Sequence, residues 1–300
     1  MIHTYIHKLM DNLPPPTSLQ RLDVVLDGGV FNGSYLVGAL HFLKEMEARR
    51  FVRVERISGC SIGSIVGLLY WADALDAMPP LYQLVQTHFR ETQMLQVLTQ
   101  LETHVAPLLP PDICARVHKK LYVCYHDIKK QKKIVRHSYK NVDDLLETVL
   151  RSCFVPGLVD GSLLYKGRYL DGLNAHLFAP SPGKKVLHME LFGYDKASYS
   201  LNIKNEQTNF HRILSGLLDI HSFFIKQSST PMCSYVDEWS LWNQANYQVK
   251  LWIERVIVCV VWWWIKLKPH VLNTVPCKGA DLVAKLLQAN VKVWIEVFCL

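Results

Sequence analysis

The sequence predicts an α/β fold in which a mainly parallel central sheet is flanked by helices. The uninterrupted apolar run 22–26 is typical of a strand buried on both faces. A helical pattern and a second apolar, β-branched run follow it, and this β-α-β-α order favours a parallel sheet covered by helices. Half of the 300 residues are hydrophobic, which is enough for the large core that such a fold needs.

The first helix is expected over about 33–49, because apolar residues recur there at helical spacing. The run 51–57 predicts the second strand, and 62–74 predicts the helix that follows it. Region 79–122 is helical in pattern, is punctuated by prolines and contains no strong strand signal, so a helical insertion is predicted there.

Later elements alternate again between helix and strand. A helix is expected over 142–151, short strands near Leu163 and Tyr169, and a return to the sheet over 185–192. The last part of the chain differs, because 251–265 is its most hydrophobic stretch. Its uninterrupted apolar run of about ten residues is shorter than the roughly 20 that span a bilayer, so we expect a buried strand or an interfacial anchor.

Bulk properties limit the possible locations. The net charge is +7 and the pI is about 8.9, which suits an anionic membrane surface or nucleic acid but specifies neither. Residues 1–20 are polar, are broken by three prolines and show no signal peptide, so an intracellular location, cytoplasmic or at the membrane periphery, is expected. The eight cysteines include no CxxC pair, which favours a reducing compartment.

One segment offers an obvious nucleophile. Gly59-Cys60-Ser61-Ile62-Gly63 lies between the second strand and its helix, so it predicts a sharp turn with an exposed serine hydroxyl. Glycines two places on either side remove side chains that would clash in the bend. Ser61 could instead cap the helix, since serine is a favoured N-cap residue.

A glycine-rich loop precedes this turn. Asp27-Gly28-Gly29-Val30-Phe31-Asn32-Gly33 follows the first strand, and its backbone N–H groups could stabilise an oxyanion. A dinucleotide-binding turn is the alternative, although the G-x-G-x-x-G spacing is absent.

A carboxylate follows further along the chain. In Tyr169-Leu170-Asp171-Gly172 an Asp-Gly pair ends a short strand, which is usually only a turn. Next to a serine, however, Asp171 could act as a general base. Cys114, His118, Cys124 and His126 could together bind zinc, but their spacing is not a standard one. Chance clustering in a helix is therefore the preferred interpretation, and no metal or cofactor is predicted.

These three motifs, with Val155-Pro156-Gly157-Leu158 shortly before the third, resemble the patatin-like phospholipases over about residues 22–177. The resemblance implies a patatin-like three-layer α/β/α fold and a lipid acyl hydrolase of the phospholipase A type that works through a Ser-Asp dyad and an acyl-enzyme. It implies the following roles: Ser61 as nucleophile, Asp171 as base, Gly28, Gly29 and Val30 as oxyanion hole, and Gly33, Gly59, Gly63 and Gly172 as motif-supporting residues.

The resemblance also divides the chain. Residues 1–20 are expected to form an N-terminal extension and 21–250 a catalytic domain with its helical insertion at about 79–122. Residues 251–300 then form a Trp-rich segment, packed on the domain or associated with a membrane.

The chain departs from the family pattern at three places. Val30 replaces a glycine, and Asn32 replaces an arginine or lysine before the last glycine of the loop, which removes a source of positive potential. Leu173 follows Asp171-Gly172 where the family has glycine or alanine. Valine should be tolerated only if its backbone does not need a conformation reserved for glycine. A catalytically impaired binding module is therefore an alternative function.

A Ser-His-Asp carboxylesterase is the chemical rival, with His176, His188 and His211 as candidate histidines. The order of elements argues against it, because the elbow of α/β-hydrolases follows several strands. A phospholipid or other acyl lipid is the expected substrate. Peripheral membrane contact is expected through Trp262, Trp263 and Trp264 and through Lys129–Lys133, and no nucleic-acid partner is expected.

Overall fold

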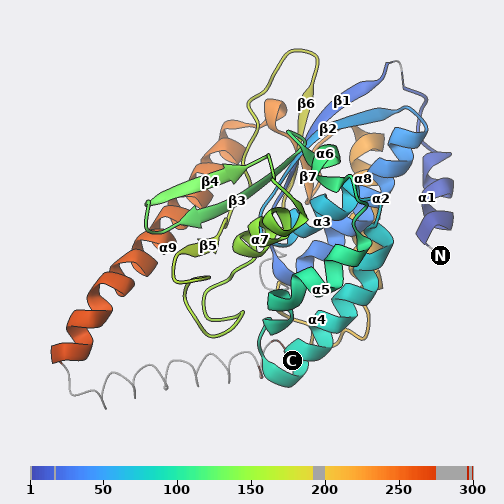
Figure 1. Cartoon of the computed structure of the whole chain (residues 1–300). Helices are drawn as coiled ribbons and strands as arrows, with labels where there is room; N and C mark the ends of the chain where they lie inside the picture. The colour runs from blue at the N-terminus through green and yellow to red at the C-terminus, as the bar shows by residue number, and fades with distance from the viewer. Residues whose placement is uncertain (1, 17, 192–199, 275–295, 297–298, 300) are drawn as a thin grey trace.

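The structure is a computed structural model, which describes residues 2–16, 18–191, 200–274, 296 and 299. A seven-stranded sheet forms its centre (Figure 1). Six strands follow the order β4-β3-β2-β1-β6-β7, and β5 pairs with β3. The strands are β1 Gln20–Leu26, β2 Val52–Gly59, β3 Leu121–Asp127, β4 Lys132–Arg136, β5 Tyr169–Asp171, β6 Lys185–Met189 and β7 Cys233–Tyr235.

The middle of the sheet is parallel and its margins are antiparallel. β3, β2, β1 and β6 run parallel to one another, whereas β4 and β5 are antiparallel to β3 and β7 is antiparallel to β6. The predicted α/β fold with a mainly parallel sheet is therefore confirmed. Parallel strands end at the same edge, so the loops that follow β1 and β2 lie side by side.

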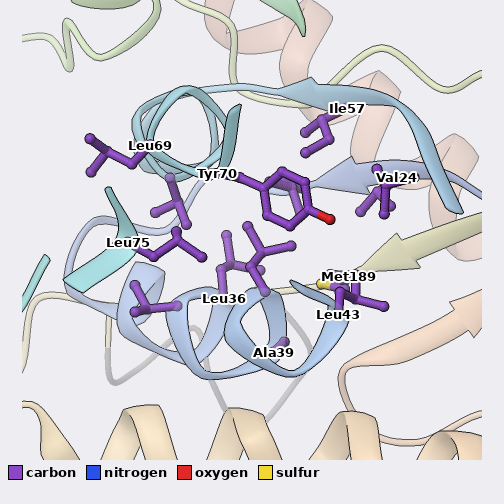
Figure 2. Packing of buried hydrophobic residues seen from close by; sticks show 14 of the residues in the cluster. Val24, Leu36, Ala39, Leu43, Ile57, Leu69, Tyr70, Leu75 and Met189 are labelled. Atoms are coloured by element: carbon purple, nitrogen blue, oxygen red, sulfur yellow. The ribbon is translucent and has the colours of Figure 1, made fainter. Parts of the chain in front are cut away.

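Helices cover the sheet on both sides. They are α1 Ile2–Met10, α2 Gly33–Ala48, α3 Ile62–Trp71, α4 Met78–Thr92, α5 Leu101–Val105, α6 Ile113–Val117, α7 Val142–Ser152, α8 Phe210–Lys226 and α9 Leu241–Thr274. The main core packs α2 and α3 against β1 and β2, where Leu36, Leu43 and Tyr70 meet Val24 and Ile57 (Figure 2). α9 lies beside the β3–β4 hairpin, away from α2 and α8 (Figure 1).

The early elements agree with the sequence. The predicted strands and helices of 22–74 correspond to β1, α2, β2 and α3, and the helix expected over 142–151 is α7. The strand expected near Tyr169 is β5, while the region of Leu163 forms no strand and only an isolated bridge at Tyr165. β6 begins at Lys185 as expected, but Phe192 lies outside the described residues.

Two later segments differ from the secondary structure expected for them. Helical region 79–122 gives way to β3 at Leu121, so Cys124 and His126 lie on a buried strand, not on a helix. A short apolar run of this kind cannot be told from a buried helix by its periodicity. Segment 251–265 is part of helix α9 and not a strand, because its buried positions recur every three or four residues. None of the described helices combines the length and the apolar character needed to cross a membrane.

Candidate active site

Ser61 occupies a strained turn between β2 and α3. Its φ of 49° and ψ of −131° lie in a region that L-residues rarely adopt. Both flanking glycines are needed, because a Cβ on Gly59 would lie 2.5 Å from the Gly63 oxygen, and one on Gly63 would lie 2.6 Å from the Leu26 oxygen. The predicted sharp serine turn is present in this form.

Neighbouring serines hold the Ser61 backbone in place. Its N–H donates to Ser152 Oγ at 3.0 Å and lies 3.1 Å from the Ser152 carbonyl oxygen. Its carbonyl oxygen accepts a hydrogen bond from Ser64 Oγ at 2.6 Å. Ser61 stands at the N-cap position of α3, but its side chain makes no capping hydrogen bond. The hydroxyl is thus not used to cap the helix, and the alternative role of Ser61 as a capping residue is not supported.

Asp171 is a buried carboxylate at the end of β5. Its Oδ1 accepts a hydrogen bond from the Leu173 N–H at 2.7 Å, while Oδ2 is buried without a hydrogen-bond partner in the described part of the chain. Burial raises the pKa of Asp171 to about 6, although the Leu173 N–H and the Ser61 hydroxyl oppose the rise. The carboxylate therefore lies near enough to Ser61 for the serine hydroxyl to affect its pKa. It is also more basic than the carboxylate of an exposed aspartate.

The turn after Asp171 packs closely against the backbone of β3. A Cβ on Gly172 would lie 2.4 Å from the Cys124 carbonyl oxygen, so this position excludes larger residues. Leu173 adopts a φ of 58°, in the left-handed region that favours glycine. Leu173 therefore holds a strained backbone conformation at the position where the family pattern has glycine or alanine.

The glycine loop after β1 lies against the nucleophile. A Cβ on Gly28 would be 3.0 Å from Ser61 Cβ, and one on Gly33 would be 2.1 Å from Ile62 Cγ1. Within the described chain, the N–H groups of Gly28, Gly29 and Val30 make no hydrogen bond. Hydrogen bonds within the described structure therefore leave these three donors unused.

Val30 is the unusual member of this loop. Its φ of 46° lies in the left-handed region, where a β-branched side chain is an outlier. Strain of this kind costs on the order of 1–3 kcal/mol and persists only where the surroundings impose it. Val30 thus adopts a backbone conformation that favours glycine, which is the condition under which valine is not expected to be tolerated in this loop.

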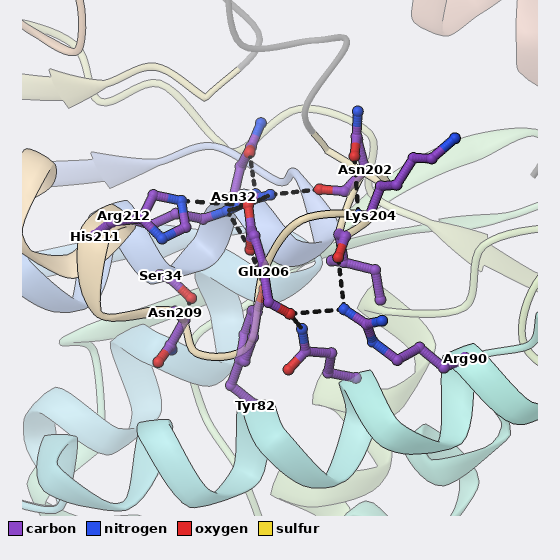
Figure 3. A network of polar contacts seen from close by, with 12 residues as sticks. Asn32, Ser34, Tyr82, Arg90, Asn202, Lys204, Glu206, Asn209, His211 and Arg212 are labelled. Atoms are coloured by element: carbon purple, nitrogen blue, oxygen red, sulfur yellow. Dashed lines mark hydrogen bonds and ion pairs between the residues drawn. The ribbon is translucent and has the colours of Figure 1, made fainter. Parts of the chain in front are cut away.

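Asn32 connects the loop to a cation that the sequence did not reveal. Asn32 is fully buried, and its Oδ1 accepts a hydrogen bond from Nη1 of Arg212 at 2.7 Å (Figure 3). Arg212 comes from α8 and also pairs with Glu206 at 2.6 Å. The guanidinium therefore anchors the loop through Asn32, and Glu206 balances its charge.

Asp27, at the start of the same loop, is held by two partners. Its Oδ1 lies 3.1 Å from His188 Nε2, and its Oδ2 accepts from Lys250 Nζ at 3.2 Å. Burial raises the pKa of Asp27, but His188 and Lys250 outweigh it and lower that pKa to about 2. Asp27 is an ionised anchor, which distinguishes it from Asp171.

A second buried charge cluster lies one helical turn further along α9. Glu254 accepts from Asn174 Nδ2 at 2.7 Å and from Lys133 Nζ at 2.9 Å, and it lies 3.0 Å from His126 Nε2. Burial raises the pKa of Glu254, yet these partners lower it overall. Since Asn174 follows the turn of Asp171, α9 contacts the loops on both sides of Ser61.

An almost wholly apolar pocket opens beside Ser61. α4 and the segment 95–105, both from the predicted helical insertion, form much of its wall. Its lining residues are Val30, Phe31, Ser34, Ser61, Ile62, Ile65, Met78, Leu81, Tyr82, Leu84, Val85, Leu95, Val97, Leu98, Leu101, His104, Val105, Cys153 and Val155. Such a surface suits a hydrocarbon chain better than a polar substrate.

The histidines of the rival triad lie elsewhere. His188 contacts Asp27, His211 pairs with Glu206, and His176 packs near Tyr122 and Phe178. No described histidine hydrogen-bonds to Ser61, so the geometry does not support a Ser-His-Asp arrangement.

The cysteine and histidine residues considered for zinc do not come together. Among the described residues, the group that brings three possible ligand atoms within 4.8 Å of one another is His3, His41 and Asp76, on other elements. His126 of the predicted set contacts Glu254 instead.

Three residues of the site were not found from the sequence: Arg212, Lys250 and Glu254. Each contacts a partner that is remote in the sequence, and spacing carries no information about such a pair. One signal did exist, because Lys250 and Glu254 interrupt a hydrophobic stretch one turn apart. Charges within an apolar helix commonly mark its buried polar contacts.

Comparison with known protein families agrees with this geometry. The family model described as patatin-like phospholipase matches residues 24–79, which contain the glycine loop and the serine turn. This match to about a fifth of the chain, together with the mainly parallel α/β sheet, supports an assignment to the patatin-like phospholipase family. No curated protein matches the chain.

Proposed function

We propose that this protein is a lipid acyl hydrolase of the phospholipase A type that uses a Ser61-Asp171 dyad. The observation that carries the proposal is the environment of Asp171. It is a buried carboxylate with a pKa raised to about 6, it has an unpartnered Oδ2 among the described residues, and it lies next to a serine in a strained turn. Buried polar atoms are normally satisfied, so an unpartnered carboxylate oxygen beside Ser61 supports the role of Asp171 as the base that accepts the serine proton.

In the first step, Ser61 Oγ attacks the ester carbonyl while Asp171 takes the hydroxyl proton. The negative charge that develops on the carbonyl oxygen is stabilised by the N–H groups of Gly28, Gly29 and Val30. One such donor contributes about 3–4 kcal/mol to transition-state stabilisation. The tetrahedral intermediate then expels the alcohol, which receives the proton from Asp171, and an acyl-enzyme remains.

In the second step, Asp171 accepts a proton from water, whose oxygen attacks the acyl-enzyme carbonyl. The Ser61 ester bond breaks, the proton returns to Ser61 Oγ, and a fatty acid leaves. The apolar pocket beside Ser61 would hold the acyl chain during both steps. Phospholipids and other acyl lipids are therefore the proposed substrates.

Two substitutions test the dyad. Ser61→Ala and Asp171→Asn should each lower ester hydrolysis by about 10³-fold or more, since loss of a nucleophile or base removes the chemistry itself. Ser138→Ala, at an exposed serine, is the matched control and should hydrolyse as the wild type does. Full activity in either dyad variant would refute the assignment.

An impaired binding module is the second candidate, and the strain at Val30 favours it. A fluorophosphonate probe separates the two candidates, because it forms a covalent bond only with an activated serine. We expect wild-type protein to be labelled at Ser61. Folded wild-type protein that resists the probe would support the binding module.

A further inference from the structure

Helix α9 exposes a long apolar stripe to solvent. Its outward side chains recur at intervals of one, three or four residues, which is the spacing of one helix face. Trp252 is 65% exposed and Trp263 is 53% exposed. The stripe consists of Val249, Trp252, Ile253, Val256, Ile257, Val260, Trp263, Trp264 and Leu267.

The opposite side of α9 is occupied by the protein itself. Val258, Val261, Trp262 and Ile265 pack in a cluster with Ile128, Leu164 and Leu170. Trp262 is thus half-buried, and only its two neighbours in the Trp262–Trp264 run point outward. The stripe is therefore a second apolar face of a helix whose first face is already used.

Cations border the stripe, and no carboxylate is exposed beside it on the helix. Glu254 is the single acidic residue between 241 and 267, and it is buried. Lys132, Arg255 and Trp263 line one surface groove between the β3–β4 hairpin and α9. Lys133 of the basic tract predicted to meet lipid is instead paired with Glu254, whereas Lys129, Lys130 and Lys132 are exposed.

We propose that this outward face of α9 binds the surface of an anionic lipid bilayer, an inference that rests on the proposed lipid substrate. Tryptophan prefers the boundary between headgroups and acyl chains, and cations beside it meet anionic headgroups. The stripe is about 27 Å long at 1.5 Å per residue, so the helix can lie flat on a bilayer.

A second copy of this chain is a poorer occupant. Two such faces in contact would bring Arg255 and Lys132 against the same cations of the other copy, and like charges across an interface oppose association. An anionic leaflet complements the same charges.

This surface is linked to the active site through the inner face of the same helix. Lys250 contacts Asp27 of the glycine loop, and Glu254 contacts Asn174 after the Asp171 turn. When α9 lies on a bilayer, these two contacts would therefore hold the glycine loop and the Asp171 turn in a fixed position relative to the lipid surface.

Vesicle sedimentation of the full chain tests the proposal. Wild-type protein should sediment with vesicles of phosphatidylcholine and phosphatidylserine more than with phosphatidylcholine alone. A triple variant, Trp252→Ser, Val256→Ser and Trp263→Ser, should lose at least about tenfold in partitioning, because apolar burial drives such binding. The control carries Leu218→Ser and Ile225→Ser, which remove exposed apolar side chains from α8, and should bind normally.

Activity on a soluble short-chain ester separates the two proposals. The triple variant should keep this activity and lose hydrolysis of vesicle lipid. If wild-type protein binds vesicles but hydrolyses neither substrate, the surface is supported and the proposed enzyme function fails. Undiminished vesicle binding by the triple variant would overturn the surface, as would a wild-type dimer that the triple variant dissociates.

A charge-reversed variant covers the case in which the triple variant does not fold. Lys132→Glu with Arg255→Glu leaves the apolar stripe intact. It should reduce binding to the anionic vesicles and leave binding to phosphatidylcholine unchanged. Equal preference for anionic vesicles in this variant and in the wild type would contradict the proposal.

Discussion

The Lys250 ammonium lies 3.2 Å from the Asp27 carboxylate, so a helix near the end of the sequence reaches the first residue of the glycine loop. Asp27 is buried and ionised, and Lys250 is also paired with Glu190 at 2.5 Å. A charge held in this way fixes backbone that would otherwise be free to shift. The proposed oxyanion hole thus depends on a contact that spans most of the chain.

Lys250→Met should therefore disturb the loop while keeping the length of the side chain. We expect kcat/KM on a soluble ester to fall about 10- to 100-fold, since small misplacements of catalytic groups have effects of this size. Lys250→Arg should restore most of the activity, and Lys226→Met, at an exposed lysine of α8, should have no effect. A fully active Lys250→Met variant would show that the contact does not position the loop.

The pH profile should report Asp171. A base must be deprotonated to accept the Ser61 proton, and burial raises the pKa of Asp171 to about 6. Ester hydrolysis should consequently decline as the pH falls through about 6. Measurement of kcat/KM from pH 4 to 8 checks this, and a midpoint near pH 4, as for an exposed aspartate, would contradict it.

Asp171→Asn should stabilise the fold while it abolishes activity. The pKa of Asp171 is raised from 3.8 to about 6 on folding, so its contribution to stability is full below pH about 4 and is lost as the pH rises through 6. The ionised carboxylate then costs about 3 kcal/mol above pH 6. Denaturant titration at pH 8 should reveal this gain in the variant, and at pH 4 the gain should vanish. Ser61→Ala retains the carboxylate and should not show it.

Val30→Gly should be more stable than Val30→Ala, which reverses the usual order. An alanine variant is normally more stable than a glycine variant by about 0.5–1 kcal/mol. At a φ of 46°, however, glycine avoids the cost of about 1–2 kcal/mol that a Cβ brings in the left-handed conformation. Thermal denaturation of both variants measures the difference. Both keep the backbone N–H at position 30, so both should still hydrolyse esters. A more stable Val30→Ala would argue against the left-handed conformation.

The sequence predicted those parts of the site that depend on local structure. The serine turn, the glycine loop and the Asp-Gly turn are short segments whose glycines report backbone geometry directly. The match to the family model covers the first two of them. The assignment of Ser61 and Asp171 as a dyad is still a prediction, which the variants above would test.

The remaining parts depend on contacts between distant segments. Nothing near Asn32 indicates that Arg212 would reach it, and the partners of Glu254 lie on three separate loops or strands. β3 was mistaken for helix because a short buried run has no distinctive period. The left-handed φ of Val30 and Leu173 was also hidden, because neither residue type signals it.

The buried contacts that Lys250 and Glu254 of α9 make with the rest of the protein limit how far the chain can be shortened. The segment that resembles the family ends near residue 177, yet a fragment cut before α9 would leave Asp27 and His126 without their charged partners on that helix. It would also uncover the apolar side chains of Ile128 and Leu170. The smallest fragment that keeps these contacts is therefore set by α9 and not by the motifs that resemble the family.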